Sequence, residues 1–229
     1  NLTLAGYSWN HEVASLVRAS AQDAAESPLP ETWQHVKAWI EMSTMSGEIC
    51  REEIAAFEEV APWLHANSKQ SPETVVAASS PNRPLWDQVV EQIRAPVERV
   101  TLVGAFFDAR LDFIRRVRDD LTPLELVVGV EPQTVSIPAE VGSMEGVKLV
   151  DASRAWKFNQ RYLHAKCILI EDVEGGTVLA TGSANPSRPA WLESGKKANV
   201  EMMLIQQGDT AKKAADRIGL GALSQSSDI

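Results

Sequence analysis

Cysteine is scarce in this chain of 229 residues, long apolar runs are missing, and basic residues are outnumbered. Two cysteines, Cys50 and Cys167, are too few for a disulfide framework, and Cys167 is interpreted as a small buried thiol. No apolar run approaches the roughly 18 residues of a membrane span, so no transmembrane segment is predicted. With 31 acidic against 22 basic residues and a net charge of −9, the general surface is not expected to coat nucleic acid.

Metal-ligand spacing is also missing: no cluster of His, Cys and Asp has the separation of a metal site, so neither metal nor cofactor is expected. Without a membrane span, the predicted location is the cytoplasm. The chain begins with Asn1 rather than Met, so loss of a leader peptide, and therefore export, stays open as an alternative.

Hydrophobic periodicity divides the chain into a helical part and an α/β part. Residues 12–24 and 31–66 carry apolar side chains at three- and four-residue steps and are predicted to be helices of an inserted or connecting bundle. The later predicted strands are 75–78, 97–107, 124–130, 147–150, 162–170 and 177–181, with helices at 84–93 and 108–120. This alternation predicts an α/β fold with a mixed β-sheet flanked by helices, and the tail from Gly219 has the composition of a frayed end.

Positive charge is concentrated in one segment, although the chain as a whole is acidic. Residues 154–197 carry a net charge of +3, which leaves −12 for the remainder. An anionic ligand is therefore expected to be drawn to this segment. Its basic residues are Arg154, Lys157, Arg161, Lys166, Arg188, Lys196 and Lys197.

The predicted strand 162–170 contains a polar pair, His164 and Lys166, in an otherwise apolar run. Residues two apart on a strand point to the same face, so the imidazole and the ammonium group should lie side by side. Burying such a pair is costly unless it meets a partner or a ligand. The pair therefore marks a candidate site for an anionic group.

Further groups follow in order. The sequence Gly-Ser-Ala-Asn at 182–185 ends the next predicted strand, and Asn-Val-Glu occupies 199–201. Lys166 and Asn185 could hold the oxygens of a phosphate through charge-assisted bonds. His164 could act as nucleophile or general acid, with Glu201 orienting its imidazole through the other ring nitrogen. This set predicts chemistry at a phosphate ester.

His-x-Lys, Gly-Ser-x-Asn and Asn-x-Glu, in this order, resemble the HKD signature of the phospholipase D superfamily. The resemblance covers most of residues 74–205 and implies catalytic roles for His164, Lys166, Asn185 and Glu201, with Ser183 and Asn199 in support. The chain departs from the signature at the family's Asp, where Glu171 and then Asp172 follow Lys166. The resemblance implies phosphodiester hydrolysis or transfer by two histidines through a phosphohistidine, without a metal.

A second His-x-Lys, His35 with Lys37, serves as an internal control. It lies on a predicted helix, where side chains two apart diverge by about 200°. No Gly-Ser-x-Asn follows it, so the pair is interpreted as an ordinary feature of a helix.

The start of the chain resembles the end of another HKD repeat. Asn1 and, further on, Asn10-His11-Glu12 match Asn185 and Asn199-Val200-Glu201 in kind. The sequence is therefore interpreted as the end of a truncated first repeat (1–12), a helical connector (13–71) and a complete second repeat (72–229). Asn1 and Glu12 would be site residues of the first repeat. Its His and Lys would come from a missing N-terminal half of the same chain, or from a second copy by dimerisation, and the fragment alone is expected to turn over little substrate.

Three functions stay open at this point. A nuclease-type phosphodiesterase is slightly preferred, because the chain has a locally basic site. A phospholipid hydrolase or phosphatidyltransferase would need an apolar entrance, which Trp156 and Trp191 could line, although a core role is the simpler interpretation of both. A non-catalytic module that binds phosphodiesters or mediates assembly of a larger protein is the third.

Overall fold

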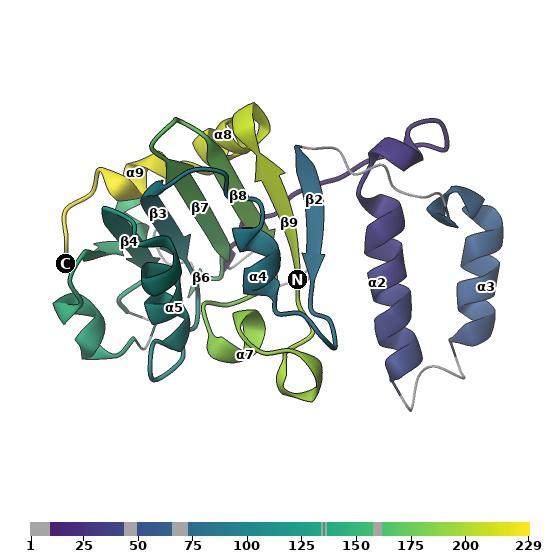
Figure 1. Ribbon diagram of the computed structural model, residues 1–229, viewed down its shortest axis with the longest axis horizontal. Helices are drawn as coiled ribbons and strands as arrows, with labels where there is room; N and C mark the ends of the chain where they lie inside the picture. The colour runs from purple at the N-terminus through teal and green to yellow at the C-terminus, as the bar shows by residue number, and fades with distance from the viewer. Residues whose placement is uncertain (1–9, 44–49, 66–72, 134, 136, 158–161) are drawn as a thin grey trace.

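A seven-stranded mixed sheet forms the centre of the molecule (Figure 1). The computed structural model describes residues 10–43, 50–65, 73–133, 135, 137–157 and 162–229. The strands, in spatial order, are β2 (Thr74–Ala78), β9 (Met202–Gln207), β8 (Thr177–Gly182), β7 (Cys167–Asp172), β3 (Val97–Val103), β4 (Glu125–Val130) and β5 (Val147–Asp151). The strands β3, β4 and β5 are parallel, whereas all other neighbours are antiparallel. The predicted α/β class with a mixed sheet is therefore confirmed.

Helices cover both faces of the sheet, and each face has its own apolar core. One core contains side chains of α4 (Leu85–Val90), α5 (Asp112–Leu121) and α7 (Arg188–Trp191). The other contains side chains of α6 (Ala152–Ala155), α8 (Gly208–Ile218) and α9 (Gly221–Ser224). Strand β7 serves both cores, since Ile168 and Ile170 belong to the first, and Cys167 and Leu169 to the second. This alternation follows the predicted faces of the strand.

The expected single strand 162–170 is interrupted in the structure. Its first two residues form β6 (Tyr162–Leu163), and β7 begins only at Cys167. Strand β6 leaves the main sheet and pairs in parallel with β1 (Asn10–His11), so that Asn10 lies opposite Tyr162. The peptide N–H of His164 then donates to the carbonyl of His11 (3.0 Å). Residues 164–166 therefore bridge two sheets, which the apolar pattern of the segment does not reveal.

Two helices, α2 (Leu29–Met42) and α3 (Arg51–Val60), stand beside the edge strand β2 and away from the rest of the molecule (Figure 1). The region 31–66, predicted to be helical, contains α2 and α3, and a short 3-10 helix, η2 (Pro62–His65), follows them. The indole of Trp39 ties α2 to the sheet by donating to the Ser79 carbonyl (3.1 Å). Three further 3-10 helices are η1 (Ala24–Glu26), η3 (Ala139–Ser143) and η4 (Gly195–Lys197).

The predicted helix 12–24 is also wrong, since residues 12–20 have no regular structure and only η1 follows them. Tertiary contacts hold this segment extended: Val13 packs against the core beneath α8, and the Ser15 hydroxyl lies 2.9 Å from that of Thr181. These contacts with the sheet outweigh the segment's own helical periodicity.

The tail is not frayed, contrary to expectation. Leu220 and Leu223 are fully buried, and Asp228 accepts a hydrogen bond from the Leu149 N–H (2.9 Å). The N–H of Ile229 donates to the Leu149 carbonyl (3.0 Å), so the last residues cover the free edge of β5. Among the helices of the described residues, none is both long and apolar enough to cross a membrane.

Candidate active site

The imidazole of His164 meets a carboxylate from the start of the chain. Nδ1 of His164 lies 2.8 Å from Oε1 of Glu12, and both side chains are largely buried. The parallel pairing of β1 with β6 brings the two residues together, because His11 lies opposite Leu163, one residue before each of them. A carboxylate can only accept, so Nδ1 carries the proton and Nε2 faces away from Glu12. The predicted orienting residue, Glu201, is therefore replaced by Glu12.

Lys166 lies beneath this pair. Its side chain is buried, and Nζ donates to the His164 carbonyl (2.6 Å). Burial lowers the pKa of the Lys166 ammonium below its ordinary value, while the negative charges of Glu12 and Glu201 oppose that shift. Lys166 is therefore a buried cation between two carboxylates, and one bond to a carbonyl uses one of its three donors.

Glu201 holds the Gly-Ser-x-Asn loop rather than the imidazole. One of its carboxylate oxygens accepts from the Ser183 hydroxyl, and the other accepts from the Asn199 amide (3.2 Å). The backbone of Glu201 exchanges two bonds with Ser79, which follows β2: Glu201 N–H donates to the hydroxyl, and the Ser79 N–H donates to the Glu201 carbonyl (both 2.9 Å). Ser79 is a supporting residue that the sequence motifs did not indicate.

The two Asn-x-Glu segments make the same internal contact. The Asn10 amide donates to Glu12 Oε1 (3.3 Å), as the Asn199 amide does to Glu201 Oε1 (3.2 Å). In both segments the Asn and Glu side chains are two residues apart and on one side of an extended backbone. Asn10 is therefore added to the candidate site residues. The sequence indicated it only through the likeness of its Asn-x-Glu segment to residues 199–201.

Asn185 sits in a loop that approaches the end of β3 closely. Its Oδ1 is shielded from solvent, and among the described residues no donor reaches it. Pro186, next in the chain, lies against Gly104, where a Cβ would fall 2.2 Å from the proline Cδ. Only glycine permits this approach, so Gly104 sets the depth at which the Asn185 loop lies.

Asp108 joins the same loop to the start of α5. Its carboxylate accepts from the N–H of Asp112 (2.7 Å) at the first turn of α5, and from the N–H of Arg188 (3.2 Å) at the start of α7. The predicted helix 108–120 thus begins four residues later than expected, at Asp112, and the Asp108 carboxylate lies beside its positive end. Residues 104–108 are thereby anchored at both ends.

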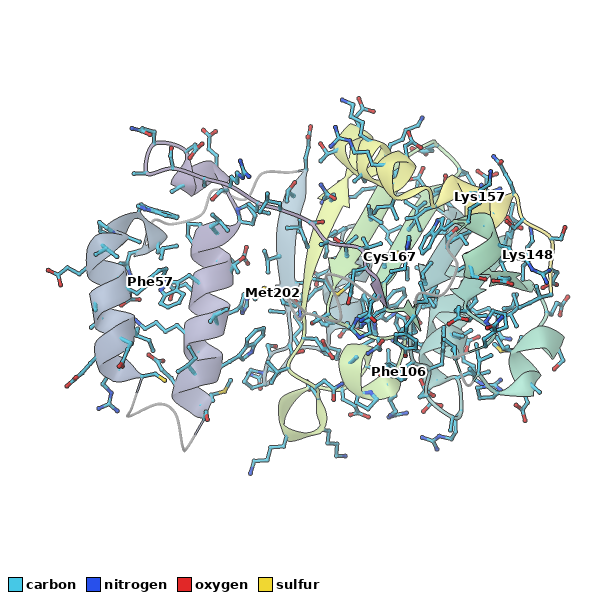
Figure 2. All side chains as sticks on the ribbon, turned by 180° about the vertical axis from the view of Figure 1, so that it is seen from behind. Phe57, Phe106, Lys148, Lys157, Cys167 and Met202 are labelled. Carbon is cyan, nitrogen blue, oxygen red and sulfur yellow. The ribbon has the colours of Figure 1, made fainter. Side chains whose placement is uncertain are left out.

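Aromatic rings line the approach to His164. The Tyr162 ring lies 6.0 Å from the imidazole, and the Phe106 ring lies 6.3 Å from Tyr162. Tyr162 comes two residues before His164, at the spacing that places side chains on one side of an extended backbone, although β6 itself ends at Leu163. Phe106, at the lower edge of the domain in Figure 2, is 55% exposed.

Solved structures give weak similarities to this chain. A mutant of yeast tyrosyl-DNA phosphodiesterase matches with a TM-score of 0.38 and 16% identity, over 59% of this chain and 30% of the yeast chain. NucT from Helicobacter pylori matches with a TM-score of 0.38 and 18% identity, over 57% of this chain and 81% of that chain. The chain thus spans less than a third of the yeast enzyme. No family model and no curated protein matches the sequence.

The sequence motifs His-x-Lys, Gly-Ser-x-Asn and Asn-x-Glu occur in a chain with a mixed sheet, and both features point to the same resemblance. The chain resembles the phospholipase D superfamily. At the position of that family's Asp, Glu171 lies near the far end of β7, where it forms an ion pair with Arg99 (3.5 Å). The structure therefore does not bring Glu171 to His164. Asn1 lies outside the described residues.

The two tryptophans that could have lined a lipid entrance, Trp156 and Trp191, make packing contacts instead. Trp191 is buried and stacks on Phe113 at a centroid distance of 4.8 Å. Trp156 donates from its indole to the Gly219 carbonyl (3.0 Å) and contacts the ring of His11. Both side chains contribute to packing, as the simpler interpretation predicted.

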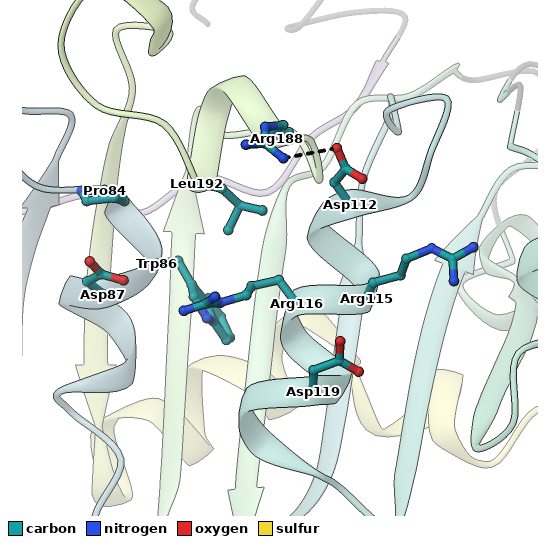
Figure 3. A pocket seen from close by; sticks show the side chains of 9 residues that line it. All are labelled: Pro84, Trp86, Asp87, Asp112, Arg115, Arg116, Asp119, Arg188 and Leu192. Carbon is teal, nitrogen blue, oxygen red and sulfur yellow. Dashed lines mark hydrogen bonds and ion pairs between the residues drawn. The ribbon is translucent and has the colours of Figure 1, made fainter.

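An open pocket of about 410 Å³ lies away from the phospholipase D-like residues (Figure 3). Helices α4, α5 and α7 line it with arginines and aspartates of mixed sign. Arg188 pairs with Asp112 (3.5 Å), as Figure 3 shows, and Arg116 pairs with Asp120 (2.7 Å). Because Arg188 and Arg116 are already paired with carboxylates, the pocket is interpreted as a largely salt-bridged surface. Within the described ranges, no group of three or more His, Cys, Asp or Glu could hold a metal ion.

Proposed function

We propose that this chain carries one half of a phosphodiesterase centre in which His164 and Lys166 act on a phosphate ester. The observation that carries the proposal is the contact of Glu12 with His164 Nδ1, beside the buried ammonium of Lys166. An imidazole held in one tautomer by a carboxylate has one free nitrogen in a fixed direction. Such a nitrogen is suited to proton transfer or attack at phosphorus.

His164 is proposed to act as the acid and base, with a second histidine as nucleophile. In the first step the second histidine forms a P–N bond, the ester P–O bond breaks, and His164 Nε2 gives its proton to the leaving oxygen. In the second step His164 Nε2 takes a proton from water, whose oxygen bonds to phosphorus as the P–N bond breaks. Glu12 stabilises the imidazolium that is present before the first step and after the second.

Lys166 and Asn185 are proposed to hold the non-bridging phosphate oxygens. A buried ammonium stabilises added negative charge strongly, because little water screens it. Asn185 has a shielded amide oxygen without a donor among the described residues, a state that costs about 1–3 kcal/mol unless a ligand supplies a partner. A bound substrate that places a hydroxyl beside Asn185 would remove that cost.

The second histidine is proposed to come from another polypeptide segment or from a second copy of the chain. The sequence contains four histidines. His35 and His65 lie on α2 and η2 in the helical part, and the His11 ring packs on Trp156 at 5.0 Å. His11 also alternates with Glu12 along the backbone, so its side chain points away from the face where Glu12 meets His164. The equivalent contacts of the two Asn-x-Glu segments support two half-sites of one kind.

The test is hydrolysis of bis-p-nitrophenyl phosphate by the wild type and by a His164→Ala variant, under the conditions of association in which the wild type turns over substrate, with His35→Ala as the matched control. His35 also begins a His-x-Lys, but its Lys37 is paired with Glu58 (2.9 Å). Hydrolysis should fall by at least about 10²-fold in His164→Ala, be unchanged in His35→Ala, and persist in EDTA because Lys166 neutralises the phosphate. Hydrolysis that survives His164→Ala would remove His164 from the mechanism.

A further inference from the structure

We infer that Phe106 and Tyr162 form a subsite that holds a base of a single-stranded nucleic acid beside His164. The inference rests on the proposed phosphodiesterase function. The Tyr162 ring is the shared neighbour: its centroid lies 6.0 Å from that of His164 and 6.3 Å from that of Phe106. A group attached to a phosphate at His164 would therefore have these two rings within reach.

The Phe106 ring is exposed although its loop is firmly held. Its neighbour Phe107 packs against the core beneath α4 and α5, whereas 55% of Phe106 faces solvent. The loop is fixed by the close approach of Gly104 to Pro186 and by the bond from the Arg188 N–H to Asp108. A ring that is exposed on an anchored loop loses little conformational freedom when it binds a ligand.

Neither ring pair is stacked face to face. The Phe106 and Tyr162 planes are inclined by 52°, and those of Tyr162 and His164 by 36°. Stacking of a base on an aromatic side chain contributes about 1–3 kcal/mol and does not require a particular base. This contribution suits an acidic chain, in which clustered surface cations cannot supply all of the affinity for a strand.

The Tyr162 hydroxyl favours a base over an acyl chain at this place. Burial raises the pKa of the Tyr162 hydroxyl, and the negative charge of Glu131, which is buried, raises it further. Tyr162 is thus a neutral donor, and Glu131 and Glu12 add negative charge near the rings. Bases carry carbonyl groups that can accept from the Tyr162 hydroxyl, whereas an acyl chain offers this donor no partner.

The test compares binding of a fluorescent oligothymidine octamer with binding of the same octamer carrying abasic residues. Phe106→Leu should weaken binding of the octamer by about 5- to 150-fold, the equivalent of about 1–3 kcal/mol, with less effect on the abasic strand. Phe106→Trp should retain the affinity. Phe57→Leu is the matched control, because Phe57 is 47% exposed and lies on α3, far from Phe106 (Figure 2).

Four results would overturn the subsite. The first three are unchanged octamer affinity in Phe106→Leu, equal weakening for the abasic strand, and a variant that loses binding to phosphatidylglycerol vesicles but not to the strand. Dissociation of a dimer by Phe106→Leu in sedimentation velocity would also overturn it, since the ring would then belong to an interface. Failure of the subsite, with His164→Ala still abolishing hydrolysis, would leave the phosphodiesterase proposal standing.

Discussion

Glu12 and His164 are 152 positions apart, and their contact is the residue-scale feature on which the proposed chemistry depends. Glu12→Gln keeps the size of the side chain but lets the amide donate, which permits the wrong imidazole tautomer. We expect kcat for bis-p-nitrophenyl phosphate to fall by about 10²- to 10⁴-fold, as the loss of an orienting carboxylate can cause. Steady-state kinetics would measure it, with Glu174→Gln at the exposed β7–β8 turn as the control.

A merely structural role for Glu12 predicts a different outcome. The Glu12→Gln variant would then lose thermal stability together with activity, and Glu12→Asp would restore neither. If kcat falls while the melting temperature is unchanged, Glu12 acts through the imidazole. Full activity in Glu12→Gln would contradict that role.

Cys167 provides a residue-scale prediction on pH. Burial raises the pKa of its thiol to about 12, from an ordinary 9.0. Between those values the native state holds a proton that the unfolded state has released, so the free energy of unfolding falls as pH rises, by up to about 1.4 kcal/mol per pH unit. Urea denaturation at pH 9 to 11 should show a shallower decline in Cys167→Ala; equal declines would contradict the buried thiol.

The sequence revealed some site residues and missed the contacts of others, for physical reasons. His164 and Lys166 were predictable because two polar residues with a period of two interrupt an apolar run. That Glu12 rather than Glu201 faces His164 was not predictable, because it depends on a two-residue pairing between distant strands. Ser79 and Phe106 belong to loops, whose positions are set by tertiary packing.

At the scale of elements, the loops that carry Phe106 and Asn185 depend on one close approach. Gly104→Ala would place a methyl group 2.2 Å from Pro186, whose ring cannot rotate away. We expect the free energy of unfolding to fall by about 1–3 kcal/mol, and hydrolysis to fall with it as the Asn185 loop is displaced. Urea denaturation would measure the first effect. Gly142→Ala is the control, because nothing lies within 4 Å of its added methyl; equal stability of the two variants would contradict the prediction.

The elements themselves were predictable where local pattern and tertiary packing agree. Strands β2, β4 and β8 lie within a residue of their predicted positions, because each is a buried run bounded by turns. The prediction of a helix at residues 12–20 was wrong, because their apolar spacing suits a helix whereas contacts with the sheet hold them extended. The prediction of a frayed tail was wrong because the polar composition of the tail outweighs two leucines, Leu220 and Leu223, which are fully buried in the structure.

At the scale of the whole molecule, a half-site predicts a reaction that depends on association. If a second copy supplies the nucleophile, specific activity should rise with protein concentration and saturate once dimers predominate. Hydrolysis assays over a thousand-fold concentration range, together with sedimentation velocity, would measure this. If another polypeptide segment supplies the nucleophilic histidine, hydrolysis should stay low at every protein concentration until that segment is added. Robust turnover by monomers at low concentration would contradict the half-site.

The parallel pairing of β1 with β6 has a consequence for motion. Only two residues of β1 pair, and the segment that follows has no regular structure, so this element can open while the seven-stranded sheet stays folded. Opening removes Glu12 from the imidazole and exposes the His164 N–H, which bonds to the His11 carbonyl. That amide should exchange with deuterium faster than those of the central strand β7. We therefore expect local unfolding of a few residues to separate Glu12 from the His164 imidazole while the seven-stranded sheet stays folded.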